Sequence, residues 1–175
     1  MPISIQNCRI ESDIGEIQAI LNHVIATSTA LYDYQPRSLD NVRIWAEQKL
    51  ANGLPLRCAF DATGILVGFA TYGAFRPQPA YKYTVEHSIY VRDGYHGRGI
   101  ASDLMMDLLN QATIGQYHVM VGCIDAQNVG SISLHKKFGF EYCGTVKQAG
   151  FKFGRWLDAS FYQKVLATPY NPVDG

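Results

Sequence analysis

The chain has 175 residues, a length that suits one domain whose core buries about two-thirds of the surface of the unfolded chain. Apolar residues make up 47% and charged residues 17%, so the composition excludes a disordered chain, and no apolar run is long enough to span a membrane. Fifteen basic residues balance fifteen acidic ones, and no local run of lysine or arginine favours nucleic acid as a partner. We expect one globular domain over residues 1–175, with about the last eight residues as a loose tail.

The cysteines are too widely spaced for a CxxC metal or redox pair, and each lies in an apolar or strand-like setting, at Cys8, Cys58, Cys123 and Cys143. We therefore expect four free thiols that serve as small core residues, and no metal. The first residues lack the charged segment and the continuous apolar stretch of a signal peptide. These features predict a reducing compartment, with the cytoplasm as the default.

The first predicted elements are a strand and two helices. Residues 3–10 alternate loosely as a strand, and the pattern Asp13-x-x-Glu16 resembles a capping box that opens a helix through about Ala26. Residues 38–51 show helical spacing before a glycine at position 53, which is typical of a helix stop. The expected buried face of this second helix consists of Leu39, Val42, Trp45 and Leu50.

The rest of the chain predicts further strands with two more helices. Residues 56–60 and 65–72 flank a short turn and predict an antiparallel hairpin. Strands are also expected at residues 81–91, 117–124, 140–146 and 155–165, and helices at residues 99–113 and 128–138. This order predicts a mixed α/β fold.

A glycine-rich turn separates the strand that ends at Val91 from the helix that follows it. Gly97 and Gly99 can adopt positive φ and let the backbone approach an anion, where a helix N-terminus also favours negative charge. The turn therefore indicates a phosphate or pyrophosphate site, although two glycines also suit a simple tight turn. A Rossmann-type dinucleotide site is a remote alternative, because Ser102 stands where its third glycine would be, while Asp125 could serve as its ribose-binding acid.

Two motifs resemble those of the GNAT superfamily of acyl-CoA N-acyltransferases. Residues 96–101 read His-Gly-Arg-Gly-Ile-Ala and depart from the family pattern only at His96. Residues 128–140 are similar to a second motif of the same family, and Asn128, Ser131 and His135 stand at its polar positions. Residues 72–77, 84–91 and 152–158 are similar to the phosphinothricin and methionine sulfoximine N-acetyltransferase branch.

The resemblance implies a fold and an activity. The fold would have a central, mostly antiparallel sheet with a splayed parallel strand pair, flanked by about four helices. The activity would be direct transfer of the acetyl group of acetyl-CoA to the α-amine of a small amino acid analogue, by a homodimer and without a metal. The alternative from another class is a protein of the same fold that senses acyl-CoA without turnover.

The resemblance also implies which residues bind acetyl-CoA. The strand end would offer backbone groups to the pantetheine amides, the turn would hold the pyrophosphate, and an asparagine side chain would bond the pantetheine arm. In chain order these residues are Ile89, Tyr90, Val91, Gly97, Arg98, Gly99, Ile100, Ala101, Ser102 and Asn128.

Two side chains are candidates for the chemistry. Glu86 lies on the strand face opposite Val85 and His87, where partial desolvation would raise its pKa and suit it to remove a proton from the amine through a water. His135 stands where much of the superfamily has a tyrosine, which implies an acid that protonates the departing thiolate. It could instead act as a second base, orient a water or be a surface helical histidine.

The substrate candidates lie in the proline-containing loop before the Glu86 strand. The Arg76 guanidinium suits a carboxylate or phosphinate, and it lies next to Pro77 and Gln78. We expect these residues and Glu86 to contact the amine substrate.

Overall fold

The computed structural model describes residues 2–174 and contains seven strands, four α-helices and one short 3-10 helix among them. In chain order the elements are β1 (Ser4–Asn7), α1 (Ile10–Thr27), α2 (Leu39–Ala51), β2 (Leu56–Phe60), β3 (Leu66–Ala74), η1 (Pro79–Tyr81), β4 (Thr84–Val91), α3 (Ile100–Ile114), β5 (Val119–Asp125), α4 (Val129–Lys137), β6 (Glu141–Lys152) and β7 (Arg155–Val165). Every predicted helix and strand is confirmed, although the boundaries differ by a few residues.

The strands follow the hydrogen-bonded order β1-β2-β3-β4-β5-β7-β6. The pairs β1–β2, β2–β3, β5–β7 and β6–β7 are antiparallel. Strands β4 and β5 pair in parallel, with Thr84–Glu86 in register with Val119–Val121. The prediction of a mixed α/β fold with a mostly antiparallel sheet, one parallel pair and four helices is therefore confirmed.

The chain forms two compact units. One contains the residues up to Thr71 together with Ser88–Asp107, and the other contains Tyr72–His87 together with the residues from Leu108 onward. Strands β3 and β4 and helix α3 each contribute residues to both units.

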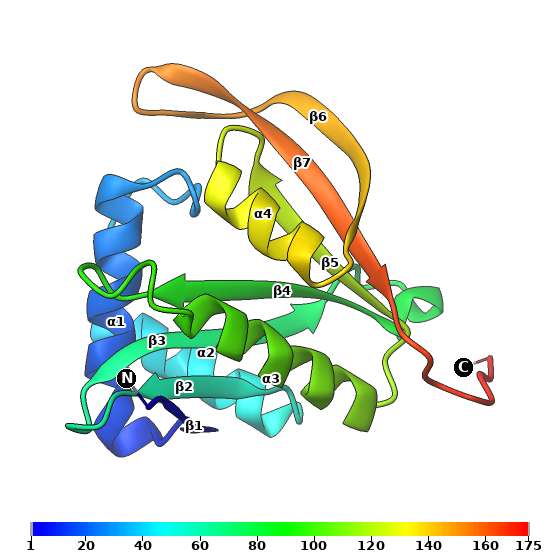
Figure 1. Ribbon diagram of the computed structural model, residues 1–175, viewed down its shortest axis with the longest axis horizontal. Helices are drawn as coiled ribbons and strands as arrows, with labels where there is room; N and C mark the ends of the chain where they lie inside the picture. The colour runs from blue at the N-terminus through cyan, green and yellow to red at the C-terminus, as the bar shows by residue number, and fades with distance from the viewer. Residues whose placement is uncertain (1, 175) are drawn as a thin grey trace. The chain divides into compact units, whose positions relative to one another are not determined.

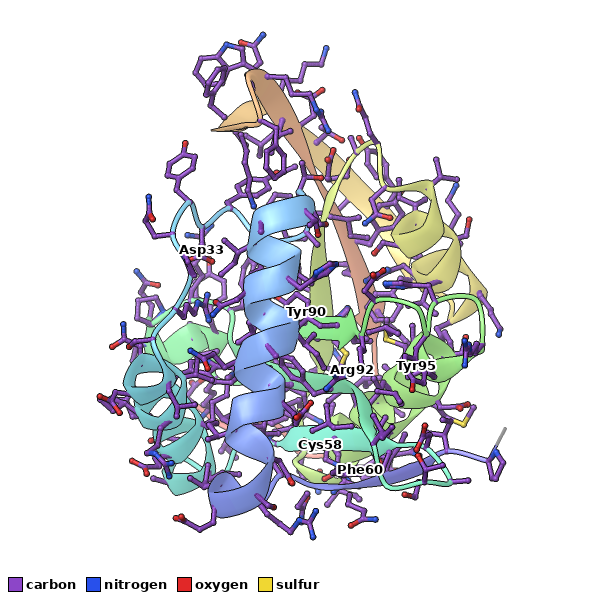
Figure 2. All side chains as sticks on the ribbon, turned by 90° about the vertical axis from the view of Figure 1, so that its left-hand side faces the viewer. Asp33, Cys58, Phe60, Tyr90, Arg92 and Tyr95 are labelled. Carbon is purple, nitrogen blue, oxygen red and sulfur yellow. The ribbon has the colours of Figure 1, made fainter. Side chains whose placement is uncertain are left out.

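Helices α1 and α2 build the core of the first unit with strands β2 and β3. Ile17 of α1, Val42 of α2 and Phe69 of β3 are fully buried members of this core. Figure 2 shows α1 in front of β2, the strand that carries Cys58 and Phe60, which belong to the same cluster. Burial of these side chains stabilises the unit by roughly 1.5–3 kcal/mol for each large apolar residue.

The start of α1 corrects the predicted capping box. The helix begins at Ile10, so Asp13 lies inside its first turns, where its carboxylate accepts a hydrogen bond from the backbone N–H of Arg9 at 2.8 Å. It also accepts from the Arg9 guanidinium and from the Ser12 hydroxyl. Asp13 therefore accepts from the backbone N–H of the N-cap residue, Arg9. The predicted capping box was wrong because it placed Asp13 at the N-cap and gave this acceptor role to Glu16.

Helix α2 begins as predicted, because the Ser38 hydroxyl accepts from the backbone N–H of Asn41 at 3.1 Å. Its predicted buried face is wrong at two positions, since Leu39 and Leu50 are 40% and 38% exposed. The fully buried positions are Val42 and Ala46, one turn apart. The helix thus packs through a stripe narrower than its apolar pattern predicts.

The second unit contains α4 and the last three strands. Figure 1 shows α4 lying along β5, with the long β6–β7 hairpin beside them. Two residues of the expected loose tail are bonded to this unit. The Thr168 hydroxyl donates to the Tyr117 carbonyl at 2.6 Å, and the backbone N–H of Val173 donates to the Tyr83 hydroxyl at 3.2 Å.

Across residues 2–174, no helix combines the length and the apolar character that a bilayer span requires.

Candidate functional site

Glu86 lies on β4 with its side chain half-buried, between the buried residues Val85 and His87. Burial raises the pKa of the Glu86 carboxyl, and the nearby Arg76 guanidinium opposes part of that rise. The alternation predicted from the sequence is therefore present for these three residues of β4. A carboxylate with a raised pKa is suited to accept a proton from a reacting group.

Arg76 follows β3 in the loop that leads to η1. Its guanidinium lies over the Phe75 ring, 5.1 Å from the centroid. Its positive charge also lowers the pKa of the Glu86 carboxyl. The structure thus brings together a cation and a carboxylate that are ten residues apart. Pro77 and Gln78 shape the rest of the loop, where the Gln78 carbonyl accepts from the backbone N–H of Tyr81 at 3.0 Å.

Cys123 is a neighbour of Glu86 that the sequence interpretation missed. It was expected in the core but is exposed, as is Cys143, whereas Cys8 and Cys58 are buried as predicted and all four thiols are free. Although the residue is exposed, partial desolvation of its sulfur by the surrounding protein and the charge of Glu86 raise the pKa of the Cys123 thiol to about 11. The strand register explains why Cys123 lies near Glu86. Val121 is paired with Glu86, and Cys123, two residues further along β5, is on the same face of the sheet.

The glycine-rich turn lies in the first unit, directly before α3. Gly97 and Gly99 have φ of 75° and 84°, and a Cβ at either position would point into open space. The backbone N–H groups of Ser102 and Asp103 donate to the Gly99 carbonyl, so these two groups are already bonded. The N–H groups that precede them at the start of a helix have no acceptor within the helix. The turn therefore fits a phosphate-bearing group, because N–H donors, a helix N-terminus and open space coincide there.

Gly68 on β3 fixes where α3 begins. A Cβ at Gly68 would come within 2.8 Å of the Tyr90 carbonyl and within 3.3 Å of the side chains of Ile100 and Leu104. No real Cβ contact is as short as 2.8 Å, so only glycine fits between β3 and the first turns of α3. This close packing sets the position of the helix N-terminus beside the end of β4.

Arginines hold the two ends of the turn. Arg92 follows β4, and its guanidinium donates to the Leu66 carbonyl at 2.6 Å and pairs with Glu16 of α1. Arg98 donates to the Gly94 carbonyl at 2.8 Å and lies over the Tyr95 ring. Figure 2 shows Tyr90, Arg92 and Tyr95 on the segment from β4 into the turn. Both arginines therefore bond the surrounding backbone.

Three predicted cofactor contacts form the end of β4. Tyr90 and Val91 are buried, and Ile89 is half-buried. Tyr90 packs on Phe69 with ring centroids 5.2 Å apart. The side chains thus anchor the strand in the core of the first unit, and any contact to a ligand would come from the backbone.

Asn128 is the N-cap of α4 in the second unit. Its side-chain oxygen accepts from the backbone N–H of Ser131 at 3.0 Å, so a hydrogen bond donated to a ligand would come from its Nδ2. The sequence motif thus contains a helix cap, which the spacing Asn128-x-x-Ser131 could have indicated.

His135 lies seven residues further along the chain and is 3% exposed, so the interpretation as a surface histidine is wrong. Its Nδ1 lies 2.7 Å from the Ser131 carbonyl, and its Nε2 lies 2.9 Å from Nε2 of His87 on β4. Both ring nitrogens are therefore engaged inside the protein. This geometry favours an orienting role over the predicted donation of a proton to a thiolate.

Burial lowers the pKa of both histidines, to about 3 for His87, whose pKa the neighbouring His135 lowers further. Unfolded histidines take up protons below about pH 6.5, while burial keeps the folded pair neutral to a lower pH. We therefore expect the free energy of unfolding to fall as the pH drops below about 6.5, by at most about 1.4 kcal/mol per pH unit for each histidine. Urea unfolding between about pH 7.5 and about pH 5 measures this slope.

The matched variant for this measurement is His135→Phe, which removes one of the two titrating rings. Its slope should be smaller by about one proton. An unchanged slope would show that other groups cause the pH dependence.

Comparison with known proteins supports one family. Residues 9–161 match the model of the acetyltransferase (GNAT) domain. The chain is 40% identical over 163 residues to the L-methionine sulfoximine/L-methionine sulfone acetyltransferase of Pseudomonas paraeruginosa, covering 93% of this chain and 94% of the relative.

Two solved structures agree. One is the N-acetyltransferase of Staphylococcus aureus, with 42% identity, a TM-score of 0.91 and coverage of 94% of this chain and 99% of the other. The second is a phosphinothricin acetyltransferase of Sinorhizobium meliloti in complex with acetyl-CoA, with 31% identity, a TM-score of 0.94 and coverage of 98% and 93%. The chain belongs to the GNAT acetyltransferase family.

Proposed function

We propose that the protein transfers the acetyl group of acetyl-CoA to the α-amine of a small amino acid analogue of the phosphinothricin or methionine sulfoximine type. The observation that carries this proposal is the half-buried Glu86 beside Arg76, a base next to an anchor for an anionic or strongly polar centre. The names of the relatives support the same substrate class.

Three sets of residues would bind acetyl-CoA in this proposal. Gly97 to Ser102 would hold the pyrophosphate, the backbone of Ile89 to Val91 would bond the pantetheine amides, and Asn128 would bond the pantetheine arm. The open space at the two glycines of the turn supports the first of these roles. When bound, acetyl-CoA would supply an activated acetyl thioester: the C–N bond would form as the C–S bond breaks, and the CoA thiolate that leaves would take the second proton lost by the amine nitrogen.

The residues of the chain would supply the proton transfers and the positioning. Glu86 would take a proton from the substrate ammonium through a water, so that the amine nitrogen has a free lone pair. Arg76, with Pro77 and Gln78, would orient the substrate. His135 on α4 would act as a positioning residue, because both of its ring nitrogens are bonded inside the protein.

Gly99→Val tests the phosphate turn. We expect loss of CoA binding, because the branched side chain would fill the open space and oppose the positive φ. Isothermal titration with CoA measures the affinity. Gly64→Val is the matched control, since Gly64 has the same φ of 84° and the same open surroundings in the β2–β3 turn. Unchanged CoA affinity in folded Gly99→Val would contradict the assignment.

Glu86→Gln tests the base. We expect kcat to fall by ~10²–10⁴ at neutral pH, the range for loss of a general base, while CoA affinity stays nearly unchanged. In the wild type, kcat/KM should fall as the pH drops through the raised pKa of Glu86, and Glu86→Gln should lack that limb. Thiol release at saturating acetyl-CoA is the assay, and the exposed Glu141→Gln is the control. A near-normal rate would exclude the base role, and no turnover in the wild type would favour an acyl-CoA sensor.

Arg76→Ala tests the substrate class. We expect KM for phosphinothricin and methionine sulfoximine to rise more than kcat falls, by the equivalent of ~1.5–3 kcal/mol for a charge-assisted hydrogen bond. Lys82→Ala is the control, because Lys82 is another loop cation that lies over an aromatic ring. A wild type that prefers a simple arylamine, or an Arg76→Ala variant with normal kinetics on both analogues, would overturn the substrate class.

We also propose that residues 1–175 act as one N-acetyltransferase domain in a cytoplasmic homodimer. The match over residues 9–161 supports a single domain. The four free thiols support a reducing compartment. An exposed aromatic pair on the β6–β7 hairpin, Phe151 and Trp156, supports self-association.

Trp156→Lys tests the dimer. The ring is 58% exposed and packs edge-on against Phe151, so a charge there should disfavour an apolar interface. We expect light scattering to give a dimer mass for the wild type and a monomer mass for Trp156→Lys at micromolar concentration. Ile114→Lys, at another exposed apolar residue, is the control. A monomeric wild type would contradict the proposal.

A further inference from the structure

The second unit contains a buried pair of histidines. His87 on β4 and His135 on α4 are 8% and 3% exposed, and their ring planes lie at 24° to each other with centroids 4.9 Å apart. Phe140 and Tyr162 add their rings to the cluster around His135. The Nε2 atoms of the two histidines are 2.9 Å apart, which is a hydrogen-bond distance.

The hydrogen bonds assign the protons. The Ser131 carbonyl can only accept, so Nδ1 of His135 carries a hydrogen and donates it over 2.7 Å. The Nε2 of a neutral His135 is then an acceptor, and Nε2 of His87 must be the donor. The Nδ1 of His87 is left as a bare lone pair, buried and without a partner among the described residues. Burial lowers the pKa of both rings, so both histidines are neutral near pH 7, and the hydrogen bonds then give each of them one defined tautomer.

Strand β5 allows the pair to form because it has glycine at position 122. A Cβ at Gly122 would lie 2.4 Å from Nε2 of His135 and 3.0 Å from Nε2 of His87. Any other residue would push the histidines apart. His135 of α4 can thus reach His87 of β4 across β5 at this point.

We propose that the His87–His135 pair is a positioning device for the reaction, which ties the strand of Glu86 to the helix that Asn128 caps. His87 is adjacent to Glu86 in β4, and Asn128 begins the helix that carries His135. His87 acts through His135, and His135 keeps its Nδ1 proton on Ser131. This inference rests on the proposed acetyl transfer, and it makes both histidines positioning residues.

Two substitutions of similar length separate the hydrogen bond from packing. His87→Gln keeps an N–H donor near the position of Nε2, whereas His87→Met keeps comparable bulk and has no donor. We expect His87→Met to lower kcat about tenfold, the rate equivalent of one buried hydrogen bond, and His87→Gln to restore most of the rate. KM for both substrates should change less than kcat. The exposed His23→Met is the control and should leave both constants unchanged.

Gly122→Ala tests the same device without altering a histidine. Its methyl group should displace His135 and lower kcat to a similar extent. The double variant with His87→Met should lose less than the product of the two single losses, because both changes break one interaction. Equal rates for His87→Met and His87→Gln, or independent effects of the two changes, would overturn the proposal.

Nitrogen-15 NMR of the histidine rings provides a readout that does not depend on turnover. We expect the Nδ1–H tautomer for His135 and the Nε2–H tautomer for His87, both neutral at about pH 7. Any other tautomer, or a cationic ring, would overturn the pair. If the tautomers are as assigned but the wild type transfers no acetyl group, the proposed function fails and the hydrogen-bonded pair stands.

Discussion

The alternation of side chains along β4 is the constraint on which the proposed chemistry depends. Successive residues of a strand point to opposite faces, so burial of Val85 and His87 leaves Glu86 on the other face. Glu86 is thereby half-buried, and this partial burial raises its pKa although the nearby Arg76 guanidinium opposes part of the rise. His87 faces the buried aromatic cluster that contains the rings of His135 and Phe140. Adjacent residues of one strand therefore occupy opposite chemical environments.

Glycine supplies the second constraint at three separate places. Gly68 lets β3 and the start of α3 approach each other, and Gly122 makes room for the two histidine rings. At Gly99 the reason is different, because a positive φ and open space suit a backbone that holds an anion. At Gly68 and Gly122, other protein atoms occupy the space that a side chain would fill. At Gly99, that space is open and leaves room for a ligand.

Local signals predicted most of the fold because they depend on neighbours in the chain. Ser38 and Asn128 were predicted at helix starts, and both are N-caps with bonded side chains. The same local reasoning failed for Asp13, which bonds backwards to Arg9 from inside α1. It also failed for Leu39, because periodicity gives an apolar face but not the width of the surface that covers it.

The sequence by itself determined the order of the elements, the glycine-rich turn, the family resemblance and the face of β4 that carries Glu86, because all of these follow from spacing along the chain. Only the tertiary structure decided which distant side chains meet. Arg76 came to lie near Glu86, Cys123 was exposed on the neighbouring strand, and His135 reached His87. Strand register and the packing of α4 on β5 bring these groups together, and neither can be obtained from the spacing of residues within one segment.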